Sequence, residues 1–220
     1  AGAVCVSVSG LIGGTKVALE PFGLKLRDLT DRGLSVWLWD RSGTRGEKLP
    51  MEPGQRRHGK EAAAVFQLAK HECADVGWLT FSGGSIAPLM SLQSTGSLQP
   101  RFLIDVEGPS DRLSIRRPVP DNLIGTLKAE REYGDPPPHE HIWEPYRLLA
   151  SFRGAYYRFQ GTFDHMHKHC LLHSEVMIQA AGSGSHLNNR VKNEPRRDLQ
   201  GQIRDHGGDI LTAIDSGFAD

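Results

Sequence analysis

The sequence lacks a set of cysteines that could pair. Its 220 residues include three cysteines, Cys5, Cys73 and Cys170, which are far apart and have no C-x-x-C spacing. An odd number of widely separated thiols argues against a disulfide framework and against a zinc site built on cysteine. These thiols do not indicate whether the protein works in an oxidising or a reducing compartment. We expect a soluble protein, either cytoplasmic or exported with its leader removed.

Net charge and long apolar runs are also absent. Lysine plus arginine number 26 and aspartate plus glutamate number 26, so the formal charge is zero before histidine is counted. This balance provides no electrostatic attraction to nucleic acid or to an anionic membrane. No apolar run approaches the roughly 18 residues that a membrane span needs. We therefore expect no nucleic-acid partner and no membrane span, and a small neutral molecule as the partner.

The sequence does contain an alternation of strand and helix patterns. Apolar runs predict strands at 3–10, 34–40, 76–81, 101–108 and within 154–164. Helical spacing predicts helices at 21–33, 59–74, 85–93, 170–182 and within 199–217, whereas the polar segment 183–197 predicts a loop. This order is typical of an α/β protein with a mostly parallel, doubly wound sheet and helices on both faces.

The length fits one domain over residues 1–220. Between the fourth and fifth strands lies a Pro-rich segment, 113–153, that is too long for a simple crossover. We interpret it as a small helical cap or lid inserted into the domain, lying over the site. Four aromatic residues are candidates either for lining that site or for the core: Trp143, Tyr146, Tyr156 and Tyr157.

The stretch "TFSGG" (80–84) ends a buried strand at a serine. A nucleophile elbow is a sharp strand-to-helix turn that needs small residues two before and two after the serine, usually as G-x-S-x-G. Here the pattern is T-x-S-x-G, with Thr80 in place of the first glycine and Gly84 in place of the second. The pattern favours Ser82 as a nucleophile, although a plain tight turn would have the same composition.

A nucleophilic serine needs an orienting acid, a base and an oxyanion hole. Asp164 follows the fifth strand, and His186 follows one helix later, so the chain order is Ser, Asp, His. We interpret Asp164 as the acid that orients the imidazole of His186, which acts as general base and acid. The backbone N–H groups of Gly83 and of Leu11, in the loop after the first strand, are the expected oxyanion donors.

At these positions the chain resembles the α/β-hydrolase superfamily, particularly its small dienelactone-hydrolase-like and prolyl-oligopeptidase-like members. The segment "DRSGTRGE" (40–47) is similar to the loop that the family carries after the strand preceding its elbow. The resemblance implies an eight-stranded, mostly parallel sheet, a Ser-His-acid triad, and hydrolysis of an ester, thioester or amide without a metal or cofactor. The stretches that carry it are "VSVSGLIGG", "FGLKLRDLTDRGLSVWLWDRSGTRGE", "VGWLTFSGGSIAP", "FLIDVEGPSDR" and "YYRFQGTFDH".

Two assignments have rivals in the sequence. Some hydrolases place the acid after the strand that follows the elbow, which makes Glu107 or Asp105 an alternative to Asp164. His206 is the alternative base, because it leaves room for a strand ahead of it. Both alternatives remain open at this point.

The segment "HMHKHCLLH" carries four histidines, His165, His167, His169 and His173, and could bind a metal, although a solvated helix start explains it better. Our main hypothesis is a carboxylic-ester hydrolase that works through an acyl-enzyme, with a small-molecule ester or a short peptide as substrate. The alternatives are a serine peptidase of the prolyl-oligopeptidase type and a non-catalytic binding protein with an eroded triad. The oligomeric state stays open.

Overall fold

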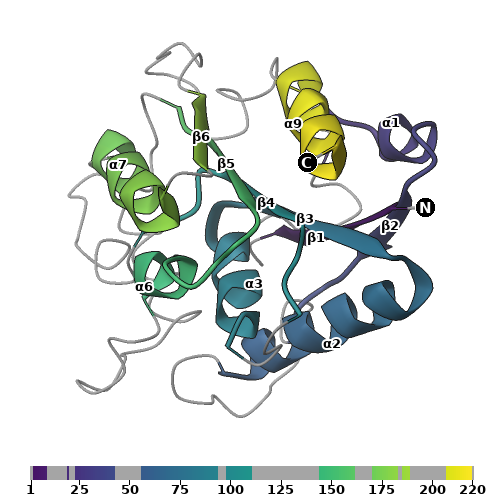
Figure 1. Cartoon of the computed structure of the whole chain (residues 1–220), viewed down its shortest axis with the longest axis horizontal. Helices are drawn as coiled ribbons and strands as arrows, with labels where there is room; N and C mark the ends of the chain where they lie inside the picture. The colour runs from purple at the N-terminus through teal and green to yellow at the C-terminus, as the bar shows by residue number, and fades with distance from the viewer. Residues whose placement is uncertain are drawn as a thin grey trace.

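The computed structural model describes residues 2–8, 19, 23–42, 56–93, 98–110, 144–161, 170–182, 185–188 and 207–219. Within these ranges the chain forms one six-stranded sheet in which every pairing is parallel. Figure 1 shows it edge to edge, from β6 to β2. The strands are β1 (Gly2–Val8), β2 (Ser35–Leu38), β3 (Asp75–Phe81), β4 (Phe102–Val106), β5 (Ala155–Phe159) and β6 (Ser185–Asn188).

The strand order, β2-β1-β3-β4-β5-β6, reverses direction once. The chain first adds β2 on one side of β1, then crosses back to place β3 on the other side, and all later strands extend the sheet in that second direction. Sheets of this kind bind ligands outside the carboxyl ends of the strands where the direction reverses. That point lies between the ends of β1 and β3.

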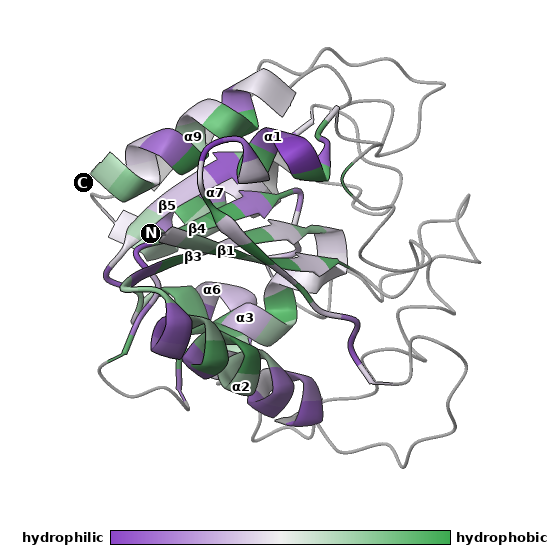
Figure 2. Cartoon of the chain, turned by 90° about the vertical axis from the view of Figure 1, so that its right-hand side faces the viewer, coloured by the Kyte–Doolittle hydropathy of each residue, from purple (hydrophilic) through white to green (hydrophobic). Residues whose placement is uncertain are grey.

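Helices cover both faces because the central strands are apolar on both sides. On one face Trp78, Leu103 and Tyr156 pack against helices, and on the other Leu79, Ile104 and Tyr157 do. In Figure 2, α2, α3 and α6 lie on the first face, and α1 and α9 lie on the second. The helices are α1 (Leu26–Thr30), α2 (Arg56–Glu72), α3 (Ile86–Ser91), α6 (Pro145–Leu149), α7 (Cys170–Ala181) and α9 (Gly207–Ala219).

The direction of α9 matters for the site. Its end packs at the amino ends of the strands, since Phe218 contacts the ring of Phe102 at 4.9 Å between centroids and lies against Gly2. Thirteen residues of helix extend roughly 20 Å, and in Figure 2 the helix runs back across the sheet from the side on which β1 begins. The first residue of α9, Gly207, is therefore at the carboxyl edge of the sheet.

The five predicted strands and the five predicted helices are confirmed, with ends that differ by a few residues. The α/β class and the doubly wound sheet are confirmed as well. The predicted loop at 183–197 is wrong for Ser185–Asn188, which form the edge strand β6 beside β5. Only one of these four residues is apolar, so the apolar pattern that marks the other strands is missing.

The predicted insertion 113–153 lies outside the described residues up to position 143. Its end is part of the main domain, because Leu148, Leu149 and Phe152 belong to the core against α3 and α7. Any cap therefore ends before Glu144. Within the described part of the chain, none of the helices has the length and apolar character needed to cross a bilayer.

Candidate active site

Ser82 occupies the sharp turn at the end of β3. Its φ is +52°, in the left-handed region that non-glycine residues rarely adopt. The turn continues as a single 3-10 turn, η5 (Ser82–Ser85), and then as α3, in which Pro88 falls in the first turn, where a proline is tolerated. From Val76 to Leu92 every residue is buried except Ser82, which is partly exposed. The turn thus presents one hydroxyl at the carboxyl edge.

The residues around Ser82 are small because the turn presses against β1. A Cβ on Gly84 would lie 2.5 Å from the backbone oxygen of Ser7 and 2.6 Å from Cα of Val8, where backbone cannot yield. The Ser7 hydroxyl donates a 2.8 Å hydrogen bond to the carbonyl of Gly84 and holds it there. Thr80 is buried, and its hydroxyl donates to the carbonyl of Ile104 at 3.1 Å. A threonine is therefore accommodated at this position without an unsatisfied hydroxyl.

Glu107 stands at the corresponding place after β4. It is the other non-glycine residue with positive φ among those the structure describes, at +54°. Its side chain is fully buried, and its Oε1 accepts a 2.7 Å hydrogen bond from the backbone N–H of Gly161, just after β5. Because β3 and β4 are neighbours, the two left-handed residues end adjacent strands of the sheet.

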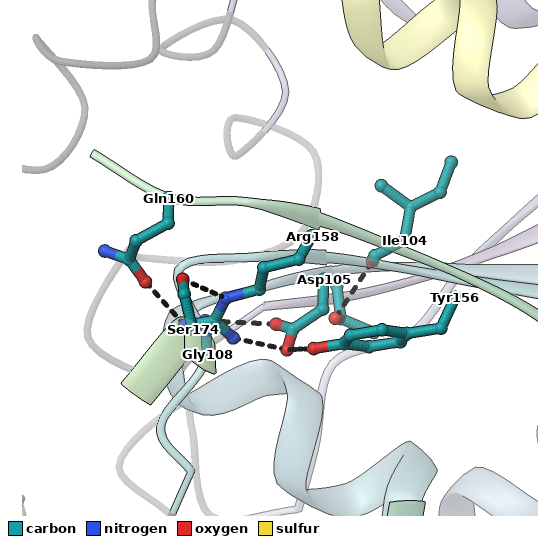
Figure 3. Close-up of polar contacts among 8 residues, drawn as sticks. Ile104, Asp105, Gly108, Tyr156, Arg158, Gln160 and Ser174 are labelled. Atoms are coloured by element: carbon teal, nitrogen blue, oxygen red, sulfur yellow. Dashed lines mark hydrogen bonds and ion pairs between the residues drawn. The ribbon is translucent and has the colours of Figure 1, made fainter. Parts of the chain in front are cut away.

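Asp105 is held in a buried ion pair on the face covered by α7. Its Oδ2 accepts hydrogen bonds from Nη1 of Arg158 at 2.6 Å and from the hydroxyl of Tyr156 at 2.7 Å, and its Oδ1 accepts one from the N–H of Gly108 at 3.0 Å (Figure 3). Both carboxylate oxygens are thus bonded inside the core. This arrangement weighs against Asp105 as the acid of a triad.

Burial and the neighbouring groups shift the pKa values of Arg158 and Tyr156. Burial lowers the pKa of the Arg158 guanidinium, but Asp105 and Tyr156 outweigh burial, so its pKa is raised and it stays charged. Burial, followed by the negative charge of Asp105, raises the pKa of Tyr156 well above its ordinary value. Tyr156 therefore stays protonated and keeps donating its hydrogen bond.

Asp105 and Arg158 belong to a row of polar residues that crosses the sheet. Strand register pairs Ser7 with Thr80, Thr80 with Asp105, and Asp105 with Arg158. All four side chains are buried, one residue before their strands end. The apolar and helical patterns of the sequence did not predict this row. Its signal is a polar residue between two apolar ones at four strand ends, in "VSV", "LTF", "IDV" and "YRF".

Several predicted site residues lie outside the described residues, namely Leu11, Asp164 and His206, together with His165, His167 and His169. The side chain of His173, in α7, lies outside them as well. His186 is the second residue of β6, where its Cα pairs with Tyr157, instead of lying in a loop. Tyr156 and Tyr157, considered for the lining of the site, are buried in the core on opposite faces of the sheet. The described ranges contain no group of three or more His, Cys, Asp or Glu side chains able to hold a metal ion.

No known family model matches the chain, and no curated protein sequence matches it significantly. Solved structures do match. Carboxyl esterase 2 from the fungus Tuber melanosporum is 15% identical, with a TM-score of 0.65, over 99% of this chain and 76% of the esterase. An esterase from Pyrococcus furiosus is 11% identical, with a TM-score of 0.67, over 99% and 81%. The type II thioesterase BorB from the borrelidin biosynthetic cluster is 15% identical, with a TM-score of 0.58, over 99% and 91%.

The likeness to these esterases and this thioesterase favours neither dienelactone-hydrolase-like nor prolyl-oligopeptidase-like proteins. At such low identity the likeness concerns the fold. The chain has the α/β-hydrolase fold.

Proposed function

We propose that the chain is a serine hydrolase that cleaves carboxylic esters, with Ser82 as the nucleophile. The observation that carries this proposal is the turn after β3, where Ser82 has a left-handed φ and alone remains accessible between Val76 and Leu92. A nucleophile benefits from this combination, because a rigid, buried turn fixes the hydroxyl while the reacting oxygen can still meet a substrate. The esterases among the similar structures favour an ester over a peptide as substrate.

In the proposed reaction, Oγ of Ser82 attacks the carbonyl carbon of the ester while a histidine takes the hydroxyl proton. The N–H groups of Gly83 and Leu11 donate to the oxyanion that forms. The bond to the alcohol then breaks, the alcohol leaves with the proton from the imidazolium, and Ser82 stays acylated. Water, deprotonated by the same histidine, attacks the acyl carbon, the bond to Oγ breaks, and the imidazolium returns the proton to Ser82 as the carboxylic acid leaves.

We assign the base to His206 in preference to His186. His186 lies within β6 and pairs with Tyr157, two residues before β5 ends. His206 directly precedes Gly207, the residue at which α9 begins at the carboxyl edge. The strand β6 also lies ahead of His206 in the chain, where the sequence leaves room for a strand.

We assign the orienting acid to Asp164. It follows Gly161 by three residues, and Gly161 leaves β5 at the same edge as Ser82 leaves β3. Asp105 is set aside because its carboxylate is already bound to Arg158, Tyr156 and Gly108. Glu107 stands at the edge too, but its Oε1 is already bound to the N–H of Gly161.

A fluorophosphonate probe, which reacts with activated serines, tests the proposal. The wild type should be labelled and Ser82→Ala should not. Ser85→Ala is the matched control, because Ser85 is a buried serine in the same turn. Ser82 should still be labelled in this variant. If the folded wild type is not labelled, the proposal fails, and a binding protein with the same fold explains the structure better.

The substrate class needs a separate measurement. A panel of p-nitrophenyl esters of increasing acyl length should be hydrolysed by the wild type, and p-nitroanilides of short peptides should be hydrolysed far more slowly. Faster cleavage of the anilides would instead indicate a peptidase.

A further inference from the structure

The peptide at Gly161 is held by buried side chains on both of its sides. Its N–H donates to Oε1 of Glu107 at 2.7 Å, and its carbonyl accepts from Nε2 of Gln160 at 3.1 Å. Glu107 comes from the turn after β4 and Gln160 from the end of β5, and both are buried. The chain that leaves β5 is thus fixed at its first residue.

Gln160 is itself held by the ion pair beneath it. Nη2 of Arg158 donates to Oε1 of Gln160 at 2.5 Å, while Nη1 of the same guanidinium donates to Asp105 (Figure 3). Asp105 in turn accepts from Gly108, the residue after Glu107. A continuous set of hydrogen bonds therefore joins the turn after β4 to the loop after β5.

Stability alone does not account for this set. Burying charged and polar groups costs desolvation, and apolar residues of similar volume often stabilise a core as well or better. Glu107 also keeps a left-handed φ, a conformation that persists where its surroundings over-determine it and that clusters at functional sites. What this set of hydrogen bonds provides is a fixed position for the Gly161 peptide at the carboxyl edge.

We propose that Glu107 and Gln160 are positioning residues for the segment that leaves β5 and leads from Gly161 to Asp164, an inference that rests on the function proposed above. By fixing Gly161 they limit where Asp164 can lie, because three residues span at most about 10 Å. A fixed Gly161 therefore restricts the positions from which Asp164 can orient the imidazole. In this arrangement Glu107 acts on this segment, and the carboxylate that orients the base belongs to Asp164.

Four variants test the proposal, with kcat and KM measured on a p-nitrophenyl ester. Glu107→Gln keeps an oxygen that can accept from Gly161 and should retain kcat within about threefold. Glu107→Ala and Gln160→Ala release Gly161 and should lower kcat by about 100-fold, the order of loss that a misplacement of about 1 Å causes, with KM little changed. Asp164→Asn should lose activity at least as strongly.

Ser174→Ala is the matched control. Its hydroxyl accepts from Nε of Arg158 at 3.3 Å and is buried in the same set, but it does not touch Gly161. It should leave kcat unchanged. Amide hydrogen exchange at Gly161 gives a readout besides activity: protection should persist in Glu107→Gln and in the control, and fall in Glu107→Ala.

Two results would overturn the inference. Suppose that Ser82 of the wild type is labelled by the probe. A decrease of kcat in Glu107→Gln as large as in Glu107→Ala would then identify Glu107 as the orienting acid itself. Full activity in Glu107→Ala and Gln160→Ala, with Gly161 still protected, would reduce the set to a structural role. Absence of Ser82 labelling in the wild type is a different failure, since it removes the proposed function.

Discussion

At the scale of single residues, Gly84 is the position that fixes the Ser82 turn. Gly84→Ala should lower the free energy of unfolding by about 1 to 3 kcal/mol, the usual cost of overpacking, because the new methyl meets backbone of Ser7 and Val8. It should also slow fluorophosphonate labelling of Ser82. Urea denaturation and labelling rates check both effects.

Gly208→Ala is the control for this substitution. Gly208 is exposed near the start of α9 and has no atom within 4 Å of the added Cβ. Alanine there should leave stability unchanged or raise it by up to about 1 kcal/mol, through helix propensity. Equal behaviour of the two variants would contradict the account of Gly84.

The choice of base is also a single-residue question. His206→Ala should reduce kcat/KM by about 100-fold to 10,000-fold, the range that general-base catalysis contributes, and His186→Ala should leave it within about threefold. Hydrolysis of a p-nitrophenyl ester measures both. The reverse outcome would return the role to His186 in β6.

At the scale of elements, the polar row ties each strand end to a neighbouring turn or strand. Asp105→Leu and Arg158→Met should each cost about 3 to 5 kcal/mol, because each leaves the other charge buried alone. The double variant should be less destabilised than the sum by about 1 to 3 kcal/mol. Urea unfolding of the four proteins gives the coupling, and additivity within about 0.5 kcal/mol would show that the pair does not interact.

The same row shows how far sequence reasoning reaches. Apolar runs predicted five strands, and small residues located the turn at Ser82. The strand β6 was missed because Leu187 is its one apolar residue, as an edge position allows. Arg158 and Gln160 were missed for another reason: a buried polar residue is recognised by its partners, and Asp105 is 53 positions from Arg158.

At the scale of the whole molecule, one buried thiol makes the free energy of unfolding vary with pH in the alkaline range. Burial, and then nearby Cys73, raises the pKa of Cys5 to about 12 from an ordinary value of 9.0. The unfolded chain therefore loses this proton above about pH 9 while the folded chain keeps it. The contribution to the free energy of unfolding falls as pH rises from 9 toward 12, by at most about 1.4 kcal/mol per pH unit.

Cys5→Val should remove that part of the alkaline loss. The difference in unfolding free energy between wild type and variant should be constant from pH 7 to 8.5 and shift in favour of the variant above pH 9. Val4→Ala, in the same strand, should be less stable than wild type by the same amount at every pH. Parallel profiles for Cys5→Val and wild type would contradict the shift.

The all-parallel pairing also bears on how fast this molecule reaches its native state. None of the paired strands that the structure describes is joined by a tight hairpin: Trp78 pairs with Leu103, and Ala3 pairs with Val76, more than 70 positions away. Each such pairing requires the closure of a long loop, whose entropy is lost before the contacts between the strands contribute free energy. A sheet of this topology is therefore expected to fold slowly. The central strands β1, β3 and β4 are almost wholly buried in the folded chain, so a slow refolding leaves apolar surface exposed, and aggregation at high concentration is the competing reaction.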